Sequence, residues 1–222
     1  MTSVSRPVLL AWSGGKDSTL ALGALAAAST PVAGLLTTIT AEYDRISMHG
    51  VRTSLLRAQA RSLGIPLTTV EIEPAASNDS YEMRMALALE RARAEGLRSV
   101  AFGDLYLEDV RRYRERMLAA VEMTALFPLW GLPTGPLARD FLARGYRAII
   151  VCVDTEQAPA DLVGRDFDAR FLDDLPDGVD PCGENGEFHT FVHDGPLFRE
   201  PVSCVRGETV LRGGRFMYQE LL

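Results

Sequence analysis

The stretch Val8-Leu9-Leu10-Ala11-Trp12-Ser13-Gly14-Gly15-Lys16-Asp17-Ser18 decides the fold. Its first five residues form a short apolar run typical of a buried strand, and an Ala/Leu-rich helical pattern follows over 18–28. A loop between such a strand and helix faces the unpaired N–H groups at the amino end of the helix. The stretch therefore predicts an anion-binding loop near the start of an α/β domain.

The same alternation continues through the first 130 residues. We predict further strands over 32–40, 67–72 and 99–102, and helices over 51–63, 81–95 and 108–123. Strands separated by helices of this length imply βαβ units and a Rossmann-like parallel sheet, whose ligand site lies at the carboxyl ends of the strands. The fold class is therefore α/β.

The residue composition of the sequence changes after Trp130. Glycines and prolines mark a boundary there, followed by a predicted helix over 137–143, a strand over 148–153 and a loop-rich tail with short apolar stretches. We predict a nucleotide-binding domain over 1–130 and a smaller C-terminal α+β module over 131–222.

Composition limits the class of protein. The 222 residues are 47% hydrophobic, enough for a well-buried core, and a net charge of −7 argues against nucleic acid as the main partner. The apolar run near the N-terminus is too short for a signal peptide, and no stretch of 18 apolar residues predicts a membrane span. Three widely spaced cysteines are typical of ordinary thiols in a reducing compartment. We expect a cytoplasmic protein that does not bind membranes.

The glycine loop offers groups suited to phosphate. Gly14 and Gly15 would let the backbone approach phosphate oxygens, while the hydroxyls of Ser13 and Ser18 can donate hydrogen bonds. Lys16 would add a point charge, and we expect the loop to face solvent. The spacing fits neither the G-x-x-x-x-G-K-[ST] loop nor the G-x-G-x-x-G loop, so this is a different phosphate loop.

Three charged residues, Lys16, Asp17 and Asp104, are candidates for contacts with phosphate or a cation. Lys16 is the only lysine among 23 basic residues. A need for a compact ammonium at this position would explain why it was not replaced by arginine, and chance is the alternative explanation. Asp17 beside phosphate requires an intervening cation, so we assign it as a Mg²⁺ ligand. Asp104, with Gly103 before it, follows the predicted fourth strand and could contact nucleotide or Mg²⁺, or simply cap the next helix.

Two threonines near the end of the second strand are further candidates. The backbone at Thr37 and Thr38 could read the amino group of adenine at the edge of the sheet, although threonines are also common strand formers. Both readings stay open.

A second informative stretch lies near the C-terminus. Residues 180–192 read Asp-Pro-Cys-Gly-Glu-Asn-Gly-Glu-Phe-His-Thr-Phe-Val, and residues 194–198 read Asp-Gly-Pro-Leu-Phe. Together with the glycine loop and Pro128-Leu129-Trp130, this combination resembles the diphthine–ammonia ligase family of the ATP pyrophosphatase superfamily. Members of that family pair the S-G-G-K-D-S loop with a Gly-Glu-x-Gly-Glu element, a Thr-x-Val strand and an Asp-Gly-Pro-x-Phe turn.

The resemblance implies a fold of the adenine nucleotide alpha-hydrolase type and a specific chemistry. The family uses ATP and ammonium to amidate the carboxyl group of diphthine, a modified histidine on translation elongation factor 2. It implies that residues 13–18 hold ATP, with Lys16 and Asp17 catalytic, and that pyrophosphate leaves to give an acyl-adenylate. The resemblance also implies that four residues of the C-terminal motif line the acceptor side: Gly183, Glu184, Gly186 and Glu187. The carboxylates of Glu184 and Glu187 would be catalytic.

The C-terminal motif also leaves alternatives. Glu184 and Glu187 could orient ammonium, bind a cationic acceptor or act as a general base, and an isolated acidic run of this kind is more often a solvated turn. His189 beside the motif could contact substrate or relay a proton. Three widely spaced histidines do not suggest a metal site.

Two segments depart from the family pattern as found in archaea and eukaryotes. The segment Asp109-Val110-Arg111 with Glu115 keeps only the Arg and Glu, and His189-Thr190 replaces Glu-Thr. The arginine bias is typical of a bacterial-type member. We therefore expect the acceptor to be a small-molecule or modified amino-acid carboxylate, with diphthine as one member of that class. The alternatives are another ATP pyrophosphatase chemistry, such as thiolation through Cys152 and Cys182, and a non-catalytic nucleotide sensor.

Overall fold

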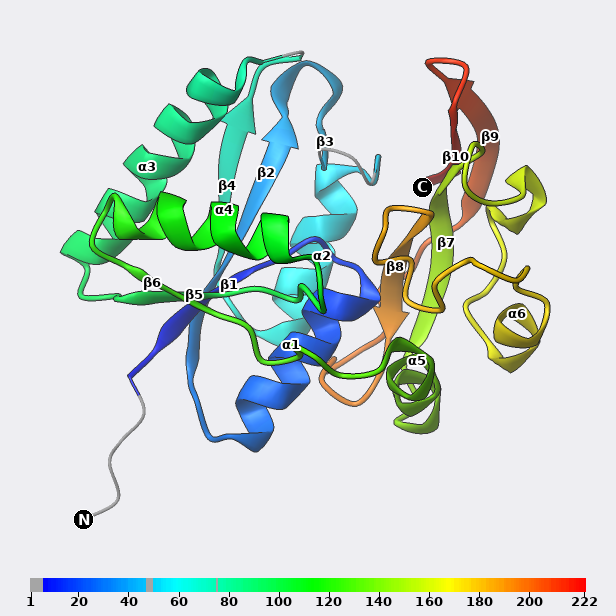
Figure 1. The fold of residues 1–222 in the computed structure, drawn as a ribbon, viewed down its shortest axis with the longest axis horizontal. Coiled ribbons are helices and arrows are strands. Elements are labelled where there is room, and N and C mark those ends of the chain that lie inside the picture. Colours follow the sequence, from blue (N-terminus) through cyan, green and yellow to red (C-terminus); the bar gives the residue numbers. More distant parts are fainter. Residues whose placement is uncertain (1–5, 47–49, 75) are drawn as a thin grey trace.

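The computed structural model describes residues 6–46, 50–74 and 76–222 and contains two β-sheets that lie side by side (Figure 1). The larger sheet has five parallel strands in the order β4-β2-β1-β5-β6. Their bounds are β1 (Val8–Ala11), β2 (Val32–Thr40), β4 (Leu67–Ile72), β5 (Ser99–Ala101) and β6 (Thr124–Leu126). The short strand β3 (Arg45–Ile46) pairs antiparallel with the end of β2. The predicted Rossmann-like α/β fold is confirmed.

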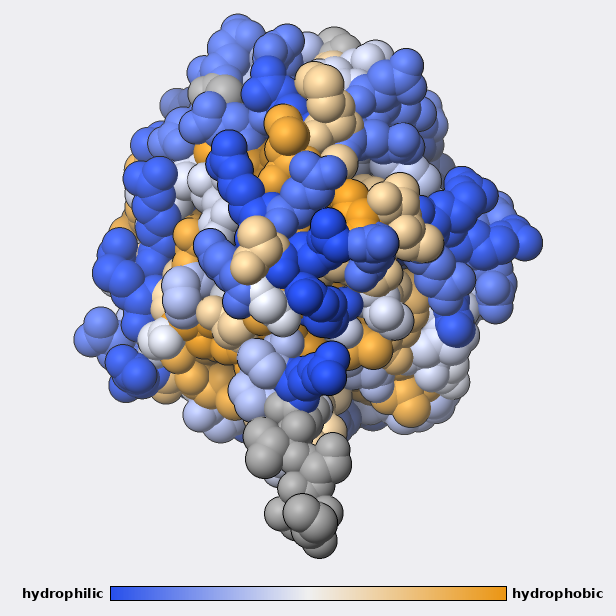
Figure 2. All heavy atoms as spheres, turned by 90° about the vertical axis from the view of Figure 1, so that its left-hand side faces the viewer, coloured by the Kyte–Doolittle hydropathy of each residue, from blue (hydrophilic) through white to orange (hydrophobic). Residues whose placement is uncertain are grey.

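Helices cover both faces of this sheet because its strands are apolar on both sides. Alternate residues of β1 divide between two apolar clusters: Val8 and Leu10 pack with α1 (Lys16–Ala27) and α2 (Thr53–Leu63), and Leu9 packs with α3 (Asn78–Ala94) and α4 (Glu108–Ala119). Figure 1 shows α3 and α4 on the side of the sheet that faces away from the second sheet. Figure 2 faces that side and shows apolar residues between mostly hydrophilic ones.

The second sheet is wholly antiparallel, in the order β8-β7-β10-β9. Its strands are β7 (Arg147–Asp154), β8 (Phe188–Asp194), β9 (Arg206–Arg212) and β10 (Phe216–Leu221), accompanied by α5 (Thr134–Ala143) and the short α6 (Ala169–Asp173). Two turns of 3₁₀ helix, η1 (Ala41–Tyr43) and η2 (Ala160–Leu162), complete the elements. The predicted α+β character of the C-terminal part is thereby confirmed.

The apolar core runs across the predicted domain boundary. One cluster contains Leu20 of α1 and Leu56 of α2 together with Phe141 of α5 and Phe188 of β8. The boundary at 130/131 lies between β6 and α5, but the two parts share this core, and the division into two domains stays a prediction.

The first residue of α3 and the last residue of α4 differ from the sequence prediction, because a helix cap sets the one and a short following strand sets the other. Helix α3 begins at Asn78, three residues before the prediction, because Ser77 Oγ accepts a hydrogen bond of 3.2 Å from Ser80 N. Helix α4 ends at Ala119, and the left-handed Glu122 (φ 56°) turns the chain into β6, which the sequence prediction missed. Within the described ranges, no helix combines the length and apolarity needed to cross a membrane.

Candidate active site

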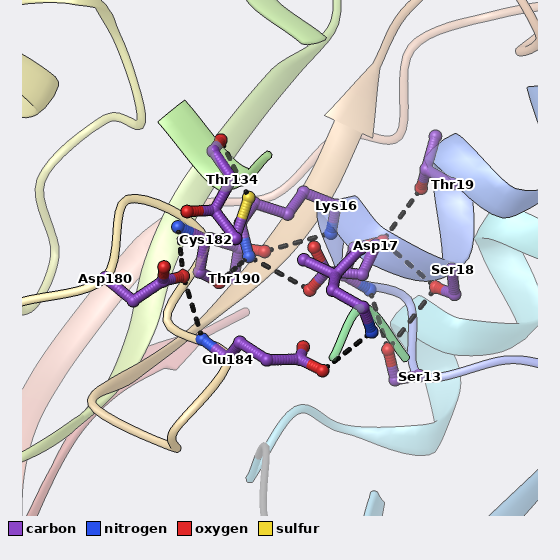
Figure 3. A network of polar contacts seen from close by, with 12 residues as sticks. Ser13, Lys16, Asp17, Ser18, Thr19, Thr134, Asp180, Cys182, Glu184 and Thr190 are labelled. Carbon is purple, nitrogen blue, oxygen red and sulfur yellow. Dashed lines mark hydrogen bonds and ion pairs between the residues drawn. The ribbon is translucent and has the colours of Figure 1, made fainter. Parts of the chain in front are cut away.

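The loop of residues 13–18 lies where β1 ends and α1 begins, at the carboxyl end of the parallel sheet and against β8 (Figure 3). A cavity of about 360 Å³ opens beside it. Most of the predicted site residues line this cavity: Ser13, Asp17, Ser18, Thr37, Thr38, Gly103, Asp104, Gly183, Glu184, Gly186 and His189. The fold therefore brings the phosphate loop and the C-terminal motif to one space.

The loop glycines are required by packing within the protein. Gly14 has a φ of 77°, and a Cβ at this position would lie 2.6 Å from Gln59 Oε1. A Cβ on Gly15 would lie 3.0 Å from the carbonyl oxygen of Thr190. Both contacts are tight for a side chain, so the glycines let α2 and β8 approach the loop. Both glycines are buried, and neither is among the residues that line the cavity.

The prediction that the loop faces solvent is wrong: Gly14, Gly15 and Ser18 are buried, and only 1% of the surface of Lys16 is exposed. Its ammonium donates to Asp17 Oδ2 at 2.9 Å and to the carbonyl oxygen of Cys182, and it lies 5.4 Å from the centre of the Phe188 ring. Burial lowers the pKa of Lys16, but the charge and hydrogen bond of Asp17, together with the charges of Cys182 and Glu184, outweigh it and raise the pKa overall. The charged amine thus ties the loop to the C-terminal motif.

Asp17 offers one oxygen for a further partner. Oδ2 accepts a hydrogen bond from Lys16 Nζ, whereas Oδ1 is buried and has no hydrogen-bond partner within the described part of the chain. The same part of the chain holds no group of three or more His, Cys, Asp or Glu side chains that could bind a metal ion. Mg²⁺ commonly uses one or two protein carboxylates together with substrate phosphates. The unpartnered Oδ1 fits that arrangement.

Asp104 is already paired. Its carboxylate receives two hydrogen bonds from Arg114, at 2.7 Å and 3.1 Å, and the guanidinium also covers the Phe102 ring at 4.5 Å. Gly103 before it packs tightly, since a Cβ there would lie 2.8 Å from the backbone carbon of Asp17. Gly103 and Asp104 therefore line the cavity, and Gly103 packs against the start of α1. The charge of Asp104 is balanced by Arg114.

The two glutamates of the C-terminal motif have different surroundings. Glu184 lines the cavity, where its Oε1 accepts hydrogen bonds from Leu105 N at 2.7 Å and Tyr106 N at 3.4 Å. Burial raises the pKa of Glu184 to about 7, against the opposing effect of the Leu105 N–H. Its carboxyl group can therefore exchange a proton near neutral pH.

Glu187 is 3% exposed and does not line the cavity. Its carboxylate accepts hydrogen bonds from Asp180 N (3.0 Å), Asn185 N (2.9 Å) and Asn185 Nδ2 (2.8 Å). All three donors belong to its own loop, so we assign Glu187 to holding that loop in shape. Any direct catalytic role for it stays an untested prediction.

His189, Thr37 and Thr38 all line the cavity. Burial and the charge of Lys16 lower the pKa of His189 to about 4, so its imidazole is neutral at neutral pH. Thr37 uses its hydroxyl to donate to the carbonyl oxygen of Trp12. Pairing of β2 with β1 ends at Leu36, and pairing with β3 begins at Ile39. On the edge of β2 that faces β1 and β3, residues 37 and 38 therefore lie in a gap between paired strands, while on the other edge both pair with β4.

Several cavity and loop residues were missed by the sequence interpretation. Thr190 Oγ1 accepts a hydrogen bond of 3.0 Å from Lys16 N, and its place in the Thr-x-Val stretch was a usable signal. Gln59 gave no local signal, because its position follows from the packing of α2. The apolar wall of the cavity was indistinguishable from ordinary core in the sequence: Tyr81, Met85, Leu89, Phe102 and Met117.

Comparison with known proteins places the chain in a family. The family model described as the diphthamide synthase N-terminal domain matches residues 6–124, and the one described as the diphthamide synthase C-terminal domain matches residues 134–218. The first match alone spans more than half of the chain. The sequence resemblance to this family is thereby confirmed.

Curated relatives carry a matching name. A human (Homo sapiens) diphthine–ammonia ligase is 28% identical over 159 residues, which cover 69% of this chain and 58% of the relative. The mouse (Mus musculus) protein of that name is 28% identical over 166 residues, with the same coverage. The zebrafish (Danio rerio) protein is 31% identical over 111 residues, 47% of this chain and 44% of the relative. Although the matches span only about half the length of these relatives, the two family matches show that the chain belongs to the diphthamide synthase family.

Proposed function

We propose that this chain is an ATP-dependent C–N ligase that adenylates a carboxyl group and transfers the acyl group to ammonia, releasing AMP and pyrophosphate. One observation carries the proposal: the phosphate loop and Glu184 line the same cavity. The name of the relatives, diphthine–ammonia ligase, supports this type of bond formation.

The loop is suited to the outer phosphates of ATP. The hydroxyls of Ser13 and Ser18 lie 3.3 Å apart at the amino end of α1, where backbone N–H groups favour anions. Asp17 Oδ1 would hold Mg²⁺, which supplies positive charge against the outer phosphates, while Lys16 neutralises Oδ2. Binding pyrophosphate as a leaving group stabilises charge that develops in the transition state.

The remainder of the cavity suits a nucleoside. Its apolar wall, which includes Met85 of α3 and Met117 of α4, offers surface for the adenine ring. The gap in strand pairing beside Thr37 and Thr38 leaves backbone groups that could pair with the adenine edge. This arrangement leaves the α-phosphate between the loop and Glu184.

The chemistry has two steps. A carboxylate oxygen of the acceptor attacks the α-phosphorus, and the bond to pyrophosphate breaks. Ammonia then attacks the acyl carbon, the bond to AMP breaks, and the proton lost from nitrogen passes to Glu184. A carboxyl group with a pKa near 7 suits a general base at neutral pH.

The acceptor we propose is a small-molecule or modified amino-acid carboxylate, and diphthine on translation elongation factor 2 is one member of that class. The ATP loop follows the family pattern throughout, whereas Asp109, Val110 and His189 depart from it. His189 lines the cavity beside Glu184, so the departure there lies where an acceptor would be recognised.

The alternative of sulfur transfer is disfavoured by the thiols. Cys152 and Cys182 are both buried, and burial raises their pKa values to about 11 and about 12. Such thiols stay protonated and are poor nucleophiles. A nucleotide sensor would need the phosphate loop but would have no need of an ionisable glutamate in the same cavity.

The test is product analysis. The purified protein, Mg²⁺, [α-³²P]ATP, ¹⁵N-ammonium and diphthine-bearing elongation factor 2 should yield labelled AMP, pyrophosphate and a ¹⁵N-amide detected by mass spectrometry. AMP without amidation of this factor would direct the search to other carboxylates. Formation of ADP and phosphate instead would contradict the proposed chemistry.

A further inference from the structure

Gln59 of α2 is a fully buried polar side chain at which three segments meet. Its Oε1 accepts a hydrogen bond of 3.0 Å from the indole N–H of Trp12, at the end of β1. Its Nε2 donates to the carbonyl oxygens of Gly14 in the phosphate loop, at 2.9 Å, and of Val192 in β8, at 2.6 Å. Both N–H groups and the oxygen of the side-chain amide therefore have a partner, and each bond connects to a different segment.

The carbonyl oxygen of Gly14 is the key partner. It accepts from Gln59 Nε2 and also from Val192 N, at 2.9 Å, so two donors hold it towards α2 and β8. The N–H at the other end of the same peptide, that of Gly15, donates a hydrogen bond of 3.3 Å to Ser13 Oγ. Ser13 lines the cavity, whereas Gln59 and Val192 are not among its lining residues. The carbonyl of this peptide therefore points to α2 and β8, and its N–H points to Ser13, the loop residue that lines the cavity, although neither glycine does so itself.

Within the loop, the hydrogen bond from Gly15 N to Ser13 Oγ favours this orientation, but the backbone itself restrains it little. A peptide between two glycines can rotate with little steric hindrance, because neither neighbour carries a Cβ. The rotated peptide would turn a carbonyl oxygen, with its partial negative charge, towards the phosphates and remove an N–H donor. Preorganised donors are the basis of oxyanion and phosphate stabilisation, so an external restraint on this peptide has a direct effect on binding.

We propose that Gln59 is a positioning residue for pyrophosphate binding, which locks the Gly14–Gly15 peptide with its N–H on the phosphate side. The inference rests on the proposed function in that the loop is assigned to the outer phosphates of ATP. Its consequence is selective: Gln59 should matter for ATP and pyrophosphate, which reach the loop, and not for AMP, which lacks those phosphates.

The primary test compares Gln59→Met with Ser62→Ala. Methionine keeps the approximate size of glutamine but cannot hold the peptide. Ser62 is a matched control on the same helix, because it is also buried and also bonds to the C-terminal part, through Glu200 O at 2.5 Å and Glu200 N at 3.2 Å. Isothermal titration calorimetry with Mg²⁺-ATP, Mg²⁺-pyrophosphate and AMP gives the affinities, and thermal melts report folding.

Gln59→Met should weaken ATP and pyrophosphate binding about tenfold and leave AMP binding unchanged. Ser62→Ala should lower the melting temperature without changing the ratio of ATP to AMP affinity. Equal losses for ATP and AMP in Gln59→Met, or no loss, would overturn the positioning role while leaving the proposed function intact. A wild-type protein that binds ATP no more tightly than AMP would overturn both, because the loop would then not bind outer phosphates.

A second variant keeps the test decisive if methionine impairs folding. In Gln59→Glu, an ionised carboxylate would face the carbonyl oxygens of Gly14 and Val192 and repel both, whereas the protonated acid can donate to one of them. ATP affinity of this variant, relative to the wild type at the same pH, should therefore improve as the pH is lowered from 8 to 6. A ratio that does not change with pH would contradict the positioning role.

Discussion

The side-chain oxygen of Thr190 accepts a hydrogen bond of 3.0 Å from the backbone N–H of Lys16, although 174 residues separate the two in sequence. This bond attaches β8 to the first turn of α1. Val192 N makes a second attachment to the loop through Gly14 O, at 2.9 Å. The C-terminal part therefore supports the loop of residues 13–18 directly, in addition to any role in binding an acceptor.

The buried position of Lys16 changes what its removal should do. Lys16→Met takes away the donor to Asp17 and to the Cys182 carbonyl in a site with almost no access to water. We expect loss of turnover together with a fall of about 1–3 kcal/mol in the free energy of unfolding, measured by urea denaturation. Arg170→Met, which removes a cation whose side chain is 86% exposed, should change stability by less than about 0.5 kcal/mol. Equal effects of the two substitutions would contradict the buried role of Lys16.

The raised pKa of Glu184 predicts a pH profile. If the ionised carboxylate accepts the proton from nitrogen, kcat/KM should rise with pH and level off above about 7. Stability should respond in the opposite direction: the folded chain holds this proton more tightly than the unfolded chain between pH 4.5 and about 7, so ionisation costs stability as pH rises through that window. Glu184→Gln should remove both dependences. Persistence of the same rising limb in the glutamine variant would assign it to another group.

Glu187→Gln should differ from Glu184→Gln in stability. Glutamine presents only one acceptor oxygen, and its NH₂ group would face N–H donors of residues 180 and 185 that the carboxylate now satisfies. We expect a loss of about 1–3 kcal/mol for Glu187→Gln, from chemical denaturation, and a much smaller change for Glu184→Gln. The latter should instead retain ATP binding and lose acceptor-dependent release of pyrophosphate. A stable but inactive Glu187→Gln would argue for direct catalysis by Glu187.

Gly103 offers a test of loop position that leaves polar groups unchanged. In Gly103→Ala, the added Cβ would lie 2.8–3.0 Å from backbone atoms of Asp17 and Ser18, so the start of α1 must shift. We expect ATP affinity to fall by about tenfold or more, measured by calorimetry. Gly135→Ala is a suitable control, since the nearest atom to its Cβ would be a flexible arginine nitrogen at 3.7 Å. Comparable ATP affinity in the two variants would show that the loop tolerates the displacement.

Much of the fold could be predicted because it is encoded in local periodicity. The predicted strands over 32–40 and 67–72 coincide with β2 and β4, whose apolar residues and flanking turn signals are local. The strands β3 and β6 are only two and three residues long, too short to show a period. Their existence depends on pairing with neighbours that are distant in the chain.

The sequence by itself determined the α/β class, the place of the glycine loop between β1 and α1, and the family, because each rests on residues that are close together or on a spaced pair of motifs. Only the tertiary structure decided which groups are available for chemistry. Glu184 and Glu187 lie three residues apart, yet Glu184 lines the cavity, whereas the carboxylate of Glu187 accepts hydrogen bonds from its own loop. Likewise, burial of Lys16 and the restraint on Gly14 depend on Cys182, Gln59 and Thr190. Hydrogen bonds and burial are set by such long-range neighbours, which local sequence patterns do not identify.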